Sequence, residues 1–286
     1  MSADFRAFAR DKVLIMSAPN GARRSHDDHP ALPMTPAESA RDAVALVEAG
    51  VSVLHLHVRD DDGKHTLDAD RYREAIEAIR KSVGDELVIQ VTTEAVGQYS
   101  SEQQMDMVRE LKPEAVSVAL REISPIDADE RIAADFFAWM RNAYIWPQVI
   151  LYSAEDVTRF DALRHRGVFA EQSPFAMFVL GNYTDSIAGS VAELDGLLAV
   201  TDPNAYPWAV CCFGQDENAV MLAATARGGH VRLGFENNLV LSGGEVAPDN
   251  AALICEYTLA SAAGARRPAS AAEVRAEFLR TPDTVL

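Results

Sequence analysis

Two histidines stand one residue apart, as His55 and His57, in the segment Val53-Leu54-His55-Leu56-His57-Val58-Arg59-Asp60. Residues two apart on a β-strand point to the same side, so both imidazoles face one way, roughly 6–7 Å apart along the strand. Each imidazole has two ring nitrogens to satisfy, which is difficult for two adjacent buried rings. The pair therefore predicts a site for a divalent metal, with a hydrogen-bonded core pair as the alternative.

A carboxylate that could complete such a site follows the strand-like segment 230–235. Alternate residues from His230 to Glu236 share one parity if this strand stays extended, which places Glu236 at its upper end and Arg232 just below. Two histidines and one carboxylate leave a coordination position open, as in catalytic zinc sites, and the same set also suits non-haem iron. We therefore expect His55, His57 and Glu236 to be metal ligands.

Other polar residues near predicted strand ends could take part in the chemistry. Arg232 is suited to bind a carboxylate in a forked geometry, unless it forms a salt bridge with Glu236 or another acid. Thr92 could hydrogen-bond a substrate oxygen and Glu94 could act as a base, although turn-forming polar residues would give the same pattern. His230, deeper in its strand, is expected to be a core residue or to lie behind the ligands.

The elements that would position these residues alternate regularly along the chain. The first predicted helix begins with Thr35 as its cap, Pro36 in the first turn and Glu38 nearby. Further helices are predicted from residue 68 and at 101–111, 128–141, 154–165, 187–200, 217–225, 250–263 and 271–279. Apolar runs predict eight strands at 13–16, 51–58, 87–92, 115–120, 148–152, 175–180, 208–213 and 230–235.

Eight strand–helix units in succession favour a (β/α)8 TIM barrel of class α/β. The strands are almost continuously apolar, as expected for parallel strands covered by helices. A doubly wound sheet would carry a glycine-rich phosphate turn after its first strand, and Ser17-Ala18-Pro19-Asn20-Gly21 lacks that fingerprint. No linker or repeat interrupts the chain, so a single domain over 1–286, with a short C-terminal tail helix, is expected.

Closure of the barrel would bring the candidate ligands together. The active site of such a barrel lies at the carboxyl ends of the strands. The second and eighth strands both flank the first, so Glu236 could reach a metal held by His55 and His57. The long segment 18–34 follows the first strand and carries several charges, and its sequence fits either a charged lid or a solvated loop.

Composition limits the kinds of partner. The 286 residues carry a formal net charge of −17, which argues against nucleic acid and anionic membranes as partners. No apolar run reaches the ~18 residues of a membrane-spanning helix, and the N-terminus lacks a signal-peptide pattern. A cytoplasmic protein is expected. Cys211 and Cys212 lie on opposite faces of a predicted strand and are expected to be buried small hydrophobic residues.

Four segments together resemble one protein family. They are Val53-Leu54-His55-Leu56-His57-Val58-Arg59-Asp60, Gln90-Val91-Thr92-Thr93, Phe178-Val179-Leu180-Gly181 and Gly229-His230-Val231-Arg232-Leu233-Gly234-Phe235-Glu236-Asn237-Asn238. The family is that of the β-keto acid cleavage enzymes, whose founding member is the 3-keto-5-aminohexanoate cleavage enzyme. The resemblance covers nearly the whole chain, in order.

The resemblance implies a zinc-dependent barrel that condenses a small anionic β-keto acid with acetyl-CoA, giving acetoacetate and a new acyl-CoA. By position, His55, His57 and Glu236 would bind the zinc. Arg232 would belong to the catalytic charge network, and Thr92 stands where the founding member has a substrate-contacting serine. The family also implies a homo-oligomer, often a tetramer. Arg121, Arg23 and Arg24 are candidates for the rim of the CoA groove.

The sequence departs from the family pattern at positions that matter for catalysis and specificity. Asn237 stands where the family commonly has an aspartate assigned to proton transfer. We therefore expect Glu94, where relatives often have glycine, to supply the base instead. Ile150 falls where the founding member has an acid on the fifth strand, and Arg23 where it has an acid in the first loop. An apolar Ile150 argues for an uncharged or hydrophobic substrate side chain.

Three other readings share some of these features. Hydrolases of the amidohydrolase type carry His-x-His on the first strand, with further histidines after the fifth and sixth, where Tyr152-Ser153 and Gly181-Asn182 supply none. A metal-dependent aldolase or lyase that needs no CoA would have the same metal site. A non-catalytic relative would keep the metal but lack the base at Asn237.

Overall fold

Eight parallel strands form a closed barrel in the computed structural model, which describes residues 5–169, 174–182 and 187–279. Neighbouring strands pair in the order β9, β11, β12, β2, β3, β6, β7 and β8, and pairing of β8 with β9 closes the ring. The predicted α/β barrel is therefore confirmed. The strands are β2 (Ile15–Ser17), β3 (Val53–Leu56), β6 (Val88–Thr92), β7 (Ala115–Ala119), β8 (Trp146–Leu151), β9 (Phe175–Asn182), β11 (Trp208–Cys212) and β12 (His230–Leu233).

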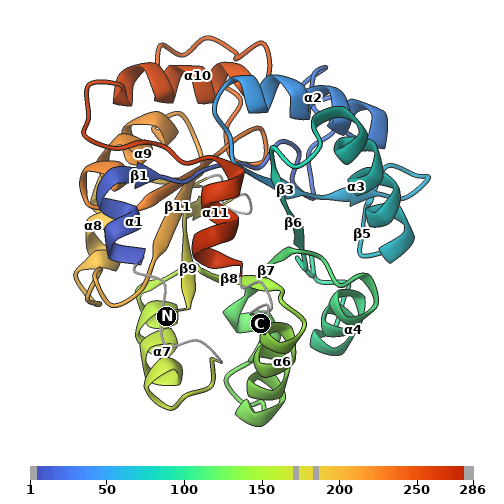
Figure 1. The fold of residues 1–286 in the computed structure, drawn as a ribbon, viewed down its shortest axis with the longest axis vertical. Helices are drawn as coiled ribbons and strands as arrows, with labels where there is room; N and C mark the ends of the chain where they lie inside the picture. Colours follow the sequence, from blue (N-terminus) through green and yellow to red (C-terminus); the bar gives the residue numbers. More distant parts are fainter. Residues whose placement is uncertain (1–4, 170–173, 183–186, 280–286) are drawn as a thin grey trace, which may run out of the picture.

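Helices surround this barrel in sequence order (Figure 1). The first of them begins as predicted, since Thr35 and Glu38 form a reciprocal capping box and Pro36 occupies the first turn. No helix in the described ranges is long and apolar enough to cross a membrane. The outer helices are α2 (Pro36–Glu48), α3 (Ala69–Val83), α4 (Ser101–Leu111), α6 (Glu130–Asn142), α7 (Ala154–His165), α8 (Val191–Leu198), α9 (Glu217–Ala226) and α10 (Asn250–Ser261).

Alternation along the strands divides the apolar residues between two cores. Side chains of one parity, such as Leu54 and Val91, pack between the barrel and its helices. Those of the other parity, such as Val53 and Met177, fill the barrel interior. Cys211 belongs to the inner core and Cys212 to the outer one, and both are buried, as predicted.

Two helices that are not part of the ring cover the end of the barrel at which the strands begin. This end is called the lower end, and the end at which the strands finish is called the upper end. Figure 1 shows α11 (Ala271–Phe278) lying across the lower end beside α1 (Phe5–Asp11). The rings of Phe8 and Phe278 contact each other at 5.2 Å between centroids, and both lie beside His230. Short strands β1 (Lys12–Val13) and β13 (Arg267–Pro268) pair next to them. The site of interest lies at the opposite end.

Several predicted bounds differ from the structure where the chain leaves the barrel. The predicted strand 51–58 ends at Leu56, after which β4 (Val58–Arg59) forms a hairpin with β5 (His65–Thr66). The predicted strand 230–235 ends at Leu233, because Gly234 has a φ of 141°. Residues predicted to begin the helix 187–200 instead form β10 (Ile187–Ala188), antiparallel to β9, and Ser190 caps α8. The short helices α1 and α5 (Leu120–Ile123) were not predicted.

Candidate metal centre and active site

Three ligand atoms converge at the upper end of the barrel. The Nε2 atoms of His55 and His57 lie 3.1 Å apart, and Glu236 Oε2 lies 3.5 Å and 3.4 Å from them. All three residues are buried, and their ligand atoms lie within 4.8 Å of one another. The sequence prediction that these three residues meet is therefore confirmed as a geometry that could hold a metal ion.

The protonation states of these groups suit a metal. His55 Nδ1 lies 2.8 Å from Gln90 Oε1, which can only accept, so Nδ1 carries the proton and Nε2 keeps its lone pair. Burial, with the nearby Arg232 charge, lowers the pKa of His55 to about 4, and burial also lowers the pKa of His57 well below its usual value. Both rings are therefore neutral at pH 7, as metal ligands must be.

Glu236 supplies the negative charge. Burial acts to raise the pKa of its carboxyl group, but the Arg232 guanidinium, 3.1 Å from Oε1, outweighs it and holds that pKa well below the usual range. Two neutral imidazoles and one carboxylate fit a divalent ion with an open coordination position. Arg232 Nη2 donates to Glu236 Oε1 at 3.1 Å and to Cys211 Sγ at 3.2 Å, so the salt bridge to Glu236, the alternative to substrate binding raised from the sequence, is present.

Glu236 reaches the histidines from a turn, not from an extended strand. Backbone pairing continues past β12, since Ala18 N donates to Leu233 O and Glu236 N donates to Ala18 O. Gly21 lies against the Glu236 side chain so closely that a Cβ atom there would stand 2.6 Å from Glu236 Cγ. Strand parity thus predicted that Glu236 would reach the histidines, but the extended conformation that it assumed for residues 234–236 is wrong.

Side chains from neighbouring helices hold this turn in place. The buried Glu217, in the first turn of α9, accepts from Gly234 N at 3.3 Å and from Asn238 Nδ2 at 3.2 Å. Asn250, in the first turn of α10, accepts from Phe235 N at 2.8 Å. The backbone amides of Gly234 and Phe235, which precede Glu236, and the side chain of Asn238, which follows it, are therefore held, and this limits how far the carboxylate can move.

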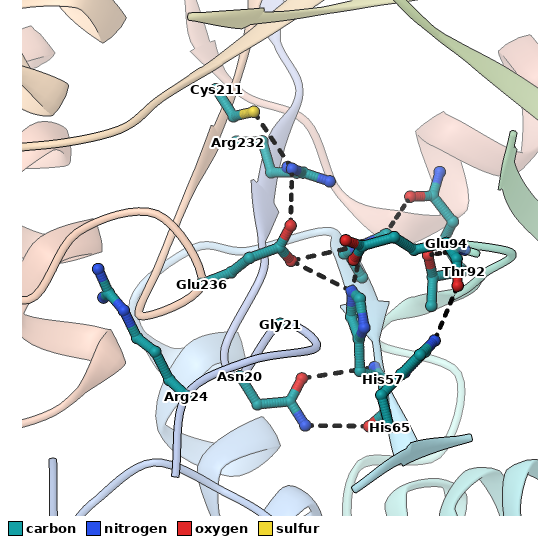
Figure 2. Close-up of polar contacts among 12 residues, drawn as sticks. Asn20, Gly21, Arg24, His57, His65, Thr92, Glu94, Cys211, Arg232 and Glu236 are labelled. Carbon is teal, nitrogen blue, oxygen red and sulfur yellow. Dashed lines mark hydrogen bonds and ion pairs between the residues drawn. The ribbon is translucent and has the colours of Figure 1, made fainter. Parts of the chain in front are cut away.

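Asn20 holds the backbone of His57 in place. Its Nδ2 donates to His57 O at 2.9 Å, and its Oδ1 accepts from His57 N at 3.4 Å (Figure 2). The same Nδ2 donates to Pro33 O. The segment 18–34 is thus neither a lid nor a solvated loop along its whole length, because Asn20, His29 and Leu32 within it are buried.

The His57 ring lies beside the ring of a second histidine, His65. The His57 and His65 rings lie 5.2 Å apart between centroids, and the Nδ1 atoms of both are buried with no hydrogen-bond partner in the described parts of the chain. His65 Nε2 lies 2.9 Å from the Glu94 carbonyl oxygen, so this nitrogen carries the proton and His65 Nδ1 is an acceptor. His57, with Nε2 turned to the metal position, carries its proton on Nδ1.

A cavity of about 190 Å³ opens beside the three ligand atoms. Thr92, Glu94 and Arg232, all predicted from the sequence, line it together with His55 and Glu236. Asn237 does not belong to this lining; its side chain is buried, and its amide has no hydrogen-bond partner among the residues described. Arg23 and Arg121 also face the cavity, whereas Arg24 donates to Phe235 O.

Glu94 is the titratable group best placed beside the ligands. Its backbone N donates to Thr92 Oγ1 at 3.0 Å, and its carbonyl is held by His65, so the side chain starts from a fixed backbone. Burial and the negative charge of Glu236 raise the pKa of the Glu94 carboxyl to about 7, while Arg23 acts in the opposite direction. A carboxyl with such a pKa can take up or release a proton near neutral pH.

Several supporting residues were not recognised in the sequence. Gln90 shares the inward parity of Thr92 and could have been found from that alone. Asn20 and Gly21 form a turn-type dipeptide, but nothing local indicates that the turn touches two ligands. Glu217 and Asn250 lie in helix first turns, where polar residues are common, so their role depends on tertiary packing.

Comparison with known proteins agrees with this site. The beta-keto acid cleavage enzyme family model matches residues 12–279. The 3-keto-5-aminohexanoate cleavage enzyme of Fusobacterium nucleatum is 29% identical over 250 residues, covering 85% of this chain and 89% of that protein. The 3-oxoadipate:acetyl-CoA acetyltransferase of Cupriavidus necator is 27% identical over 273 residues, covering 92% of this chain and 93% of its own.

Solved structures agree on the fold. The apo structure of ObcA matches with a TM-score of 0.69 at 15% identity, covering 87% of this chain, which spans 65% of the ObcA chain. The 3-dehydroquinate dehydratase of Geobacillus kaustophilus matches with a TM-score of 0.56 at 13% identity and covers 87% of this chain and 92% of its own. At such identities these matches bear on the barrel alone, but the family model spans almost the entire chain, which therefore belongs to the β-keto acid cleavage enzyme family.

Proposed function

We propose that this protein is a zinc-dependent β-keto acid cleavage enzyme, which condenses a β-keto acid with acetyl-CoA to give acetoacetate and a new acyl-CoA. The observation that supports this most directly is the convergence of His55, His57 and Glu236 beside a small cavity lined by Arg232. Relatives whose names include acetyl-CoA as a substrate, at 24–27% identity, support acetyl-CoA as the co-substrate.

The residues around the ligands have distinct parts in this reaction. Bound zinc would act as a Lewis acid toward the keto group of the substrate. Arg232, with donors left beyond those used by Glu236 and Cys211, would hold the substrate carboxylate. Thr92 would orient a substrate oxygen. Glu94 would take the proton that the aspartate at the Asn237 position takes in relatives, since its carboxyl lines the cavity and titrates near pH 7.

The cavity wall supports a substrate whose side chain is uncharged or hydrophobic next to the keto group. Ile150, Val179 and Phe213 all line the cavity. A cationic group packed against these three side chains would lose hydration without gaining a counter-charge from them. A homo-oligomer, a tetramer by analogy with the family, and a cytoplasmic location complete the proposal; size-exclusion chromatography with light scattering would measure the oligomeric state.

Turnover assays on purified protein test the proposal. The protein would be incubated with acetyl-CoA and a panel of β-keto acids with uncharged, acidic and basic side chains, and both acetoacetate and the new acyl-CoA would be quantified. We expect turnover with uncharged side chains, loss of turnover after chelation, and recovery on adding Zn²⁺. Cleavage without CoA would instead support a lyase, and metal and ligand binding without any turnover would support a non-catalytic relative.

Metal analysis supplies an independent readout. We expect about one zinc ion per chain in the wild-type protein and none in His55→Ala or Glu236→Ala, each of which removes a ligand. His29→Ala is the matched control, because His29 is also buried, between Ala31 N and Ala247 O, but is not one of the three ligands. Equal zinc content in all four proteins would exclude this metal centre.

A further inference from the structure

The cavity lining includes an arginine, Arg121, that has no part in the reaction proposed above. Arg121 lies at the start of α5, directly after strand β7, and its side chain is exposed although it also lines the cavity. Its guanidinium carbon stands 3.7 Å from the centre of the Tyr152 ring, which follows strand β8. Such stacking fixes the plane of the guanidinium and leaves its N–H groups pointing outward from the ring.

The donors of this pair have no acceptor among the residues that the structure describes. Across residues 5–169, 174–182 and 187–279, Arg121 forms no hydrogen bond and no ion pair, and neither does the Tyr152 hydroxyl. Burial and the nearby Glu94 and Glu122 raise the pKa of Tyr152, so its hydroxyl stays a donor at neutral pH. An arginine and a hydroxyl that both lack acceptors form a natural receptor for an oxyanion.

Other charges around the cavity are already engaged. Arg232 is paired with Glu236, and Glu122 accepts from Ala95 N. Glu94 and Glu122 are the acidic groups that face this region, and burial raises the pKa values of both carboxyls, which reduces their negative charge near neutral pH. The exposed guanidinium of Arg121 is therefore a positive group that an incoming anion can reach in an otherwise acidic protein.

The size of the cavity indicates what could meet this pair. The cavity, at about 190 Å³, is smaller than the roughly 300–1,000 Å³ usual for pockets of drug-sized ligands, so it accommodates a small acid but not the whole of acetyl-CoA. The outer part of either substrate must therefore extend to the mouth. Ile150 and Val179 also line the cavity and carry no charge.

We propose that Arg121 and Tyr152 form an oxyanion-binding site at the cavity mouth, which binds a carboxylate or phosphate group of a substrate during the reaction proposed above. Two sources carry that chemistry: a second carboxylate at the far end of the keto acid, and the phosphates of CoA. The site is separate from the metal centre and uses Arg121 as a specificity-determining residue rather than a catalytic one.

Steady-state kinetics with three variants test this site. Arg121→Gln removes the charge, Arg121→Lys keeps the charge without the planar fork, and Tyr152→Phe removes the hydroxyl. Arg131→Gln is the matched control, because Arg131 is also exposed, is paired with Asp129 and does not line the cavity. Each protein would be assayed with acetyl-CoA and with two keto acids of equal length, one ending in a methyl group and one in a carboxylate.

The two sources give different results. If the site binds CoA, Arg121→Gln raises the KM for acetyl-CoA by about tenfold or more with both acids, and kcat changes little. If it binds a distal carboxylate, only the KM for the acid with the carboxylate rises. Arg121→Lys should recover part of the loss and Tyr152→Phe should cause a smaller one. No KM change beyond that of Arg131→Gln would overturn the proposal.

Direct measurement of anion binding tests this site independently of the proposed reaction. Inorganic pyrophosphate and glutarate would be titrated calorimetrically into wild-type and Arg121→Gln protein. Weaker binding of either anion to the variant supports the site even if no keto acid is turned over. Equal binding of both anions to the two proteins contradicts the site even if turnover is observed.

Discussion

At the scale of single residues, the candidate site depends on which nitrogen of each imidazole carries a proton. Gln90 fixes this choice for His55, and the carbonyl of Glu94 fixes it for His65. The His57 ring lies 5.2 Å from the His65 ring between centroids, and the Nδ1 atoms of both have no hydrogen-bond partner among the described residues. Groups behind a metal ligand orient it and raise its basicity, so both neighbours should affect metal affinity.

Replacing His65 should weaken metal binding without removing a ligand. We expect His65→Phe to lower zinc affinity by about 10–100-fold, measured by competition with a chelator, because the polar ring beside His57 is replaced by one without nitrogen atoms. The d–d absorption of the cobalt-substituted protein should shift as well. His65→Gln keeps an acceptor oxygen and should recover part of the affinity. Unchanged affinity and spectrum in His65→Phe would show that the two rings merely pack together.

Glu94 should determine the pH dependence of the reaction. Its pKa of about 7 means that the carboxylate, the form able to accept a proton, predominates only above that pH. The rate of the wild-type enzyme should therefore rise with pH through about 7 and then level off. Glu94→Gln should lower kcat by about 10²–10⁴-fold and abolish this rise.

A control for Glu94 is available on the same cavity wall. Glu122→Gln keeps an oxygen that can accept from Ala95 N and should leave kcat within severalfold of wild type. Zinc content would be measured in both variants. Near-wild-type turnover of Glu94→Gln with its zinc intact would rule out Glu94 as the base.

At the scale of elements, the site is built from loops that reach across strand boundaries. The turn after β12 carries Glu236, the segment after β2 carries Asn20 and Gly21, and the β4–β5 hairpin carries His65. Figure 2 shows Gly21 and Asn20 between the Glu236 side chain and the His57 backbone. The loop after β2 therefore sets the distance between ligands that come from two different strands.

A methyl group at position 21 should disrupt the metal centre. Gly21 has a φ of 61° and its added Cβ would stand 2.6 Å from Glu236 Cγ, so Gly21→Ala should push the carboxylate away. We expect zinc content to fall to a small fraction of the wild-type value. Gly167→Ala has a comparable φ of 76° with open space around the new methyl group, so it controls for backbone strain.

These elements explain which parts of the site the sequence could predict. Strand parity depends only on local periodicity, so the shared direction of His55 and His57 and the inward position of Arg232 followed from it. The contact between Gly21 and Glu236 joins residues far apart in the chain and has no local signature. His65 returns to His57 through the β4–β5 hairpin, whose strands are joined by the aspartate-rich segment 60–64. That segment predicts a turn but does not predict where the second strand will lie.

At the scale of the whole molecule, the two ends of the barrel have separate tasks. The upper end holds the ligands and the cavity, whereas α1 and α11 cover the lower end (Figure 1). The rings of Phe8, Trp146 and Phe278 form an aromatic cluster there. In barrels of this kind the lower face contributes stability and the upper face contributes function. Substitutions at the two ends should therefore have different consequences.

Removing a ring from the lower end should lower stability alone. We expect Phe8→Ala to reduce the free energy of unfolding by about 3–5 kcal/mol, since Phe8 is only 5% exposed and contacts the rings of His230 and Phe278. Denaturant titration would measure this, and KM values below the transition should stay within twofold of wild type. A large KM change in the folded variant would show that the two ends are coupled.

The pairing of β12 with β2 has a consequence for how the molecule is completed. This seam joins the last barrel strand to the first, through pairs such as Val231 with Ile15, and the ligands lie on both sides of it. Glu236 is added to the chain long after the histidines, so the metal can find its full ligand set only when the ring has closed. A bound ion would then link residues from the two sides of that seam and slow its opening. Hydrogen exchange at β2 and β12 should be slower with zinc than without it, while β7 and β8, away from the seam, should change less.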